Sequence, residues 1–130
     1  IIGIGGNVGT QSSTIVVRGL ATGRVDVTNT IPLILKEVAV GSLLGAVYGL
    51  LVGLASEYIT GTSMSNLGIV IGLSIFCSMT IATAVGASVP IVLKKINFDP
   101  AISTGPFVTT AIDIIGVALY FLIASTILIN

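Results

Sequence analysis

The chain has 130 residues, of which 54% are hydrophobic and only 8% are charged, and its mean hydropathy is +1.15. Soluble domains carry about 25% charged residues, so this composition indicates a membrane protein and excludes a soluble domain. Five basic residues balance five acidic ones, which argues against a nucleic-acid-binding surface. The lack of histidine and the single cysteine, Cys77, exclude a disulfide framework and a Cys/His zinc site.

We expect an all-α membrane protein, a bundle with a partial first span at about 1–21 and full spans at about 33–56, 67–93 and 106–130. The chain begins Ile1-Ile2-Gly3, without a methionine or a signal peptide. We therefore expect a fragment of a longer protein, in which residues 1–130 form one membrane domain.

The first stretch, residues 1–21, is small and polar rather than strongly apolar. Its glycines would weaken a soluble helix, but glycine is common in membrane helices, where it lets backbones approach closely. Polar residues recur there at helical spacing and predict a stripe of Asn7, Gln11, Thr14 and Arg18. A glycine-rich phosphate loop is the weaker interpretation, because no strand precedes the glycines and no lysine followed by Ser or Thr comes after them. We expect the end of a helix that lines an interior.

The second span has a glycine at every fourth position, which makes a seam without side chains: Gly41, Gly45, Gly49 and Gly53. Such seams mostly mediate helix packing. We therefore favour packing within the bundle over a pore lining or a dimer face.

The connections between the spans predict the topology. Lys and Arg lie in or beside the connections 22–32 and 94–105, whereas the connection 57–66 contains none. Because cytoplasmic loops are enriched in these residues, we expect the first and third connections in the cytoplasm and Asn130 outside. This alternation is what four consecutive crossings require.

Asp113 is the only charged residue of the last span. A carboxylate at mid-membrane depth costs about 2.5–3.5 kcal/mol, so it normally faces a bundle interior or a water-filled path and has a partner. Helical steps place small or oxygen-bearing groups on its face of the helix: Gly105, Thr109, Gly116 and Tyr120. Oxygen ligands without nitrogen or sulfur suit a hard cation. The alternatives are a structural carboxylate bonded to Arg18 or to a hydroxyl group, or a proton relay in a secondary transporter.

Several segments together resemble the membrane domain of the MgtE family of magnesium channels, over essentially the whole chain. They are GGNVGTQS at 5–12, RGLATG at 18–23, Lys36-Glu37, DPA at 99–101 and GPFVTTAID at 105–113. The resemblance implies a homodimer with five membrane helices per subunit, of which this chain holds the last four. It also implies a preceding cytoplasmic magnesium-sensing region in the parent protein, and a cation path at the dimer axis.

The same resemblance identifies site residues. The aspartate of the family corresponds to Asp113, and the pore-facing position one turn earlier corresponds to Thr109, with Gly105 a turn before that. The helix bearing the GGN motif supplies the pore-lining candidates Gly6, Asn7, Thr10, Gln11 and Thr14. Some members of the family carry asparagine at the positions of Thr10 and Gly105.

These residues predict a divalent-cation channel in the plasma or inner membrane that conducts hydrated Mg²⁺ past Asp113. Magnesium releases its waters reluctantly, so a fast path should contact the hydrated ion through one or two carboxylates, which a two-fold axis would supply. The alternatives are a carrier coupled to protons or sodium, and an assembly fragment that conducts nothing. No nucleophile and base pair in the sequence supports an enzyme.

Overall fold

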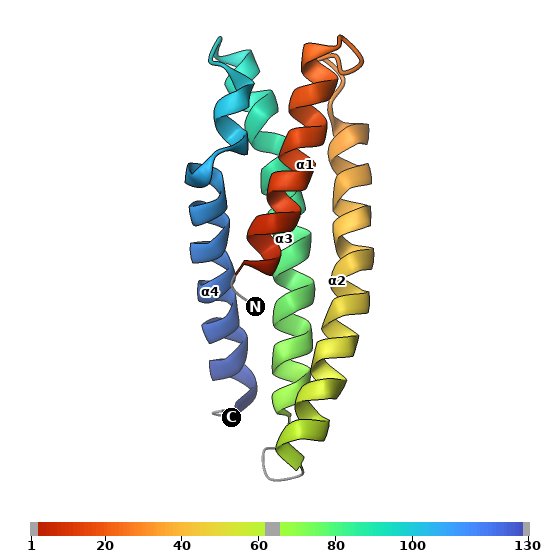
Figure 1. Cartoon of the computed structure of the whole chain (residues 1–130), viewed down its shortest axis with the longest axis vertical. Coiled ribbons are helices and arrows are strands. Elements are labelled where there is room, and N and C mark those ends of the chain that lie inside the picture. The colour runs from red at the N-terminus through yellow and green to blue at the C-terminus, as the bar shows by residue number, and fades with distance from the viewer. Residues whose placement is uncertain (1–2, 62–65, 129–130) are drawn as a thin grey trace.

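The computed structural model describes residues 3–61 and 66–128, and the regular secondary structure within them is helical. Its elements are α1 (Ile4–Ala21), α2 (Ile31–Thr60), α3 (Leu67–Lys95), the 3₁₀ helix η2 (Pro100–Thr104) and α4 (Pro106–Leu128) (Figure 1). The all-α architecture is confirmed, and the helix bounds agree with the predicted spans within a few residues. Ile1, Ile2, Ile129 and Asn130, at the ends of the first and last predicted spans, lie outside the described residues.

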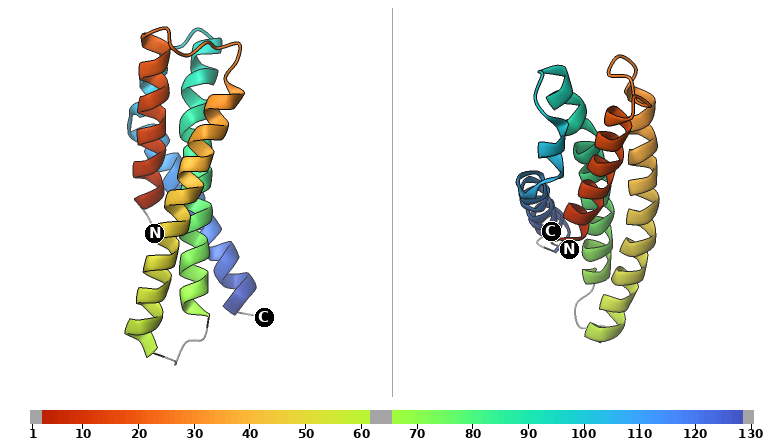
Figure 2. Two further views of the ribbon diagram at one scale, coloured as in Figure 1. Left: turned by 90° about the vertical axis from the view of Figure 1, so that its right-hand side faces the viewer. Right: turned by 45° about the horizontal axis from the view of Figure 1, so that its top comes forward.

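Three of these helices are long and apolar enough to cross a membrane: α2, α3 and Val108–Leu128 of α4. The first helix, α1, has 18 residues and begins partway along the bundle, beside α4 (Figures 1 and 2). The prediction of three full spans and one partial span is therefore confirmed.

The central helix is α3, which contacts α1, α2, α4 and η2. It meets α2 along the predicted glycine seam, whose four members are all buried. A methyl group on Gly49 would lie 2.5 Å from the carbonyl oxygen of Gly72, and one on Gly53 would lie 2.8 Å from that of Gly68. Glycine on both helices thus lets the two backbones touch, and the seam serves packing within the bundle, as expected.

The connection from α3 to α4 contains a short helix of its own. After Asp99, whose side chain accepts a hydrogen bond from the Ala101 amide at 2.9 Å, the chain forms η2. Within η2, Ser103 is only 1% exposed and bonds to Ser13 in the middle of α1. The segment therefore turns back into the bundle, and α4 begins at the depth of the middle of α1.

The ends of the helices alternate as four crossings require. The connections 22–30 and 96–99 lie at one end of the bundle, and the last turn of α2 and the first turn of α3 lie at the other (Figure 1). The last described turn of α4 points toward the α2–α3 end (Figures 1 and 2).

Candidate functional site

Asp113 lies where the start of α1 meets α4. Its Oδ1 accepts a hydrogen bond from the backbone amide of Gly3 at 3.2 Å. A methyl group on Gly6 would lie 2.8 Å from the same oxygen, so a larger residue at Gly6 would displace the carboxylate. Arg18 lies 15 residues after Gly3, or about 22 Å along the helix, and is therefore not the partner of Asp113. Gly3 and Gly6 of the first stretch therefore fix the position of the Asp113 carboxylate.

Thr109 is one turn before Asp113 and contacts Thr10 of α1, with 3.0 Å between the two hydroxyl oxygens. Thr10 also donates to the carbonyl oxygen of Gly6 at 2.8 Å. Because a hydroxyl group has a single hydrogen, Thr109 is then the donor to Thr10. The Thr109 oxygen retains lone pairs that can accept a hydrogen bond from another molecule.

The site lies near the middle of the long central helix. Ile112 packs against Ala82 of α3, and Gly116 approaches the side chain of Ser78. Asp113 lies between these two levels, and α3 runs from Leu67 to Lys95. The carboxylate is therefore about equally far from the two ends of α3.

The polar stripe of α1 points away from the bundle. Asn7, Gln11 and Thr14 are exposed, whereas the buried residues Gly5, Gly9 and Val16 face the other way toward α3. The structure thus brings Gly6 and Thr10 together with Thr109 and Asp113, and it places the remaining candidates of α1 on an adjoining open face. Gly105 is partly buried directly before α4, where its amide bonds to the carbonyl oxygen of Ile102 at 3.2 Å.

Asp113 also opens onto the outer face of α4. A shallow pocket of about 290 Å³ is lined by Thr110, Asp113, Ile114 and Val117. In the part of the chain that the structure describes, no three His, Cys, Asp or Glu side chains gather as metal ligands. One copy of the site thus offers a single carboxylate with hydroxyl and backbone groups beside it, rather than a cage for a bare ion.

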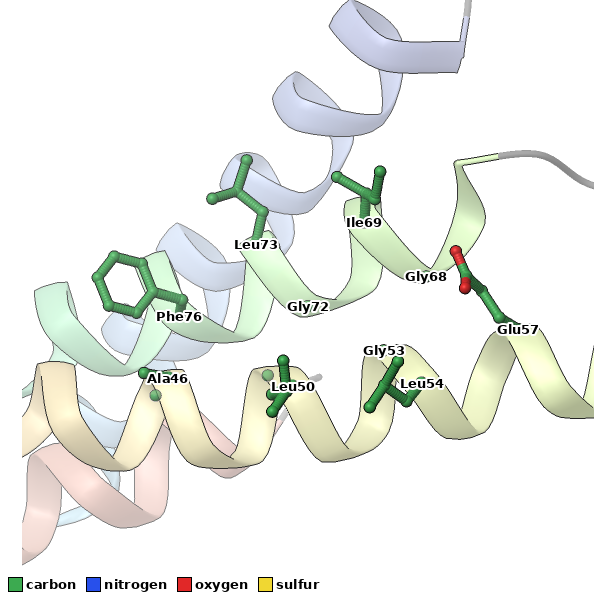
Figure 3. A pocket seen from close by; sticks show the side chains of 12 residues that line it. Ala46, Leu50, Gly53, Leu54, Glu57, Gly68, Ile69, Gly72, Leu73 and Phe76 are labelled. Carbon is green, nitrogen blue, oxygen red and sulfur yellow. The ribbon is translucent and has the colours of Figure 1, made fainter.

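A larger groove of about 380 Å³ lies elsewhere, between α2 and α3. It follows the glycine seam and is apolar except for the carboxylate of Glu57 at its end (Figure 3). It contains none of the predicted site residues.

Sequence reasoning missed one buried carboxylate. Glu37 of α2 is only 7% exposed, and its Oε2 accepts a hydrogen bond from Ser12 of α1 at 2.5 Å. A signal was present, because Glu37 precedes Gly41 by four residues and therefore continues the buried glycine face of α2. A charged residue in line with a packing seam should have been recognised as buried.

The chain is similar in sequence to known proteins. The family model described as "MgtE: Divalent cation transporter" matches residues 1–123. The chain is 42% identical to the magnesium transporter MgtE of Enterococcus faecalis over 96% of its length, and 37% identical to that of Bacillus subtilis over 96%. It is 37% identical to the magnesium transporter MgtE of Thermus thermophilus over 98% of its length. The chain spans only 27–28% of the length of these relatives.

Proposed function

The chain belongs to the MgtE family of divalent cation transporters, and from that premise we propose that it forms the conducting part of a magnesium channel in which hydrated Mg²⁺ passes Asp113. Its three long apolar helices make it a multi-pass membrane protein. We further propose that residues 1–130 are one domain of a longer protein in the plasma membrane, with a cytoplasmic sensing region and with the C-terminus outside.

The observation that carries the proposal is the meeting of α1 and α4 around one carboxylate. In a homodimer whose two-fold axis runs beside this face, two copies of Asp113 would lie across a shared path. Their charge of minus two matches a divalent cation. The exposed stripe of Asn7, Gln11 and Thr14 would then line the same path, which explains polar side chains on the outside of a membrane bundle.

The groups at the site suit a hydrated ion better than a bare one. The waters around Mg²⁺ donate hydrogen bonds outward, so a path for the hydrated ion needs acceptors. Asp113 supplies carboxylate oxygens, and Thr109 supplies an oxygen whose own hydrogen is already donated to Thr10. The backbone carbonyl of Gly105, one further turn along, extends this row of acceptors.

Electrostatics gives the expected size of the effect. A unit charge about 4 Å from a carboxylate gains about 4 kcal/mol at an effective dielectric constant of about 20. A loss of only about 1.4 kcal/mol lowers an equilibrium constant tenfold. Neutralising both copies of Asp113 should therefore reduce cation entry by more than about tenfold.

Magnesium flux into liposomes, followed with an enclosed magnesium-sensitive dye, tests the proposal. Asp113→Ala and Asp113→Asn should both reduce the flux strongly, and Thr109→Ala should reduce it less, since Thr109 contacts the ion through water at most. Glu57→Gln removes a carboxylate outside the path and serves as the matched control. Flux of Asp113→Asn equal to that of the unmodified chain would exclude this aspartate from the ion path. Flux that requires a proton or sodium gradient would favour a coupled carrier instead.

A further inference from the structure

The buried carboxylate of Glu37 has no part in the conduction path described above. Burying a carboxylate is costly unless it is hydrogen-bonded, and its hydrogen bond comes from a different helix. Ser12 of α1, itself only 3% exposed, donates to Glu37 Oε2 at 2.5 Å. This bond therefore ties α1 to α2 through the interior of the bundle.

The next residue of α1 makes a second tie in another direction. Ser13 is fully buried, and its hydroxyl oxygen lies 2.7 Å from that of Ser103 in η2. Successive residues of a helix point about 100° apart, so the two serines reach out on different sides. Together they hold α1 between α2 and η2.

These hydrogen bonds add direction to a helix whose packing surface consists largely of glycine. Gly5 and Gly9 face α3, Gly9 lies against the backbone of Gly86, and the side chain of Ile112 of α4 also lies against Gly9. Val16 is the one buried apolar side chain among the described residues of α1. Glycine surfaces allow close approach, so a side chain that adds a directional bond to a second helix helps to fix the rotation of α1.

We propose that Glu37 is a positioning residue for the cation path, which fixes the rotation of α1 through Ser12 and so holds Gln11 toward the path. The proposal rests on the proposed function, in which the exposed stripe of α1 lines that path. Gln11 directly precedes Ser12, so its direction is set by where Ser12 is held. Without the bond to Glu37, α1 turns more freely and Gln11 spends less time facing water.

The test measures the direction of Gln11 itself. Gln11→Cys, in a Cys77→Ser background and in lipid vesicles, is modified by a charged, water-soluble thiol reagent, and the rate is recorded. Adding Ser12→Ala or Glu37→Ala should lower that rate by up to about fivefold, because one hydrogen bond changes the equilibrium constant between the two orientations of α1 by about that factor. Glu37→Gln should keep the rate close to that of the Gln11→Cys parent, because its amide oxygen still accepts from Ser12.

Ser74→Ala is the matched control, because Ser74 is a fully buried serine that bonds only to Val70 of its own helix. Its rate should stay unchanged. If Glu37→Ala folds poorly, Ser12→Ala still carries the test, since it removes only one oxygen atom. A rate in Ser12→Ala equal to or above that of the parent would overturn the positioning role. A parent Gln11→Cys that does not react at all would instead contradict the proposed function, because α1 would then not face water.

Discussion

Adding a single methyl group to the glycine seam should push two transmembrane helices apart. A methyl group on Gly49 would lie 2.5 Å from the carbonyl oxygen of Gly72, whereas one on Gly45 would lie 3.0 Å from that of Phe76. Carbon and oxygen atoms in close helix contacts are about 3.3–3.6 Å apart, so Gly49→Ala requires a shift of nearly an ångström. Both obstructing atoms belong to the backbone and cannot turn aside. The helices must separate, and a gap of that size loses about a quarter to a half of the van der Waals attraction of each contact between them.

The expected cost follows from two opposing effects. Overpacking lowers the free energy of unfolding by about 1–3 kcal/mol, and replacing glycine by alanine within a helix raises it by up to about 1 kcal/mol. Gly49→Ala should therefore lower the free energy of unfolding by about 1–2 kcal/mol, and Gly45→Ala should change it less. Titration with sodium dodecyl sulfate in mixed micelles, followed by far-ultraviolet circular dichroism, measures both values.

The control is Ala55→Leu, which adds a larger side chain on the exposed face of α2. It should leave the free energy of unfolding nearly unchanged. A Gly49→Ala variant as stable as Ala55→Leu would refute the close contact between α2 and α3.

Two further predictions concern the connections between helices. Single cysteines at Asn29 and at Ser65, which lies outside the described residues, should react with an impermeant reagent from opposite sides of the membrane in a Cys77→Ser background; reaction of both from one side would contradict the four-crossing topology. The pKa of Asp26 is lowered because the backbone N–H and the hydroxyl group of Thr28 donate to its carboxylate. The stability that the ionised carboxylate contributes is therefore complete above the ordinary pKa of 3.8, and it is lost as the pH falls through the lower pKa of the folded state. Carboxyl titration by nuclear magnetic resonance measures this, and a midpoint at or above 3.8 would contradict it.

The sequence predicted the helices and the glycine seam because each depends on a local, periodic pattern. Twenty or so apolar residues define a membrane span wherever they occur, and glycine at every fourth position defines a face without reference to its partner. The pairing of that face with Gly68 and Gly72 of α3 needed the structure, although both glycines were visible in the sequence.

The site was predictable only in part. Asp113 stood out as the single charge of an apolar span, and its neighbour Thr109 followed from helical spacing. The contact of Thr109 with Thr10 joins residues 99 positions apart, and no periodicity within either helix gives such a pairing. The burial of Glu37 was missed although the glycine periodicity of α2 indicated it, because a Lys-Glu pair at the start of a span is typical of a membrane interface.

The return of η2 into the bundle was also beyond the sequence. Residues 94–105 have the composition of a surface connection, with two lysines and an Asp-Pro pair. Ser103 is buried where it bonds to Ser13 of α1, and this contact exists only once α1 and η2 have packed together. Tertiary contacts therefore decided the conformation of this segment.

The central claim is that two copies of Asp113 hold a hydrated divalent cation between them, and anomalous diffraction from crystals grown with Mn²⁺ in place of Mg²⁺ tests it most directly. A metal lies about 2.1 Å from its waters, and each water lies about 2.8 Å from an acceptor. We predict a peak on the two-fold axis of a dimer, about 4–5 Å from the carboxylate oxygens of both Asp113 residues. No peak within that distance of Asp113, with Mn²⁺ bound elsewhere along the path, would contradict the account.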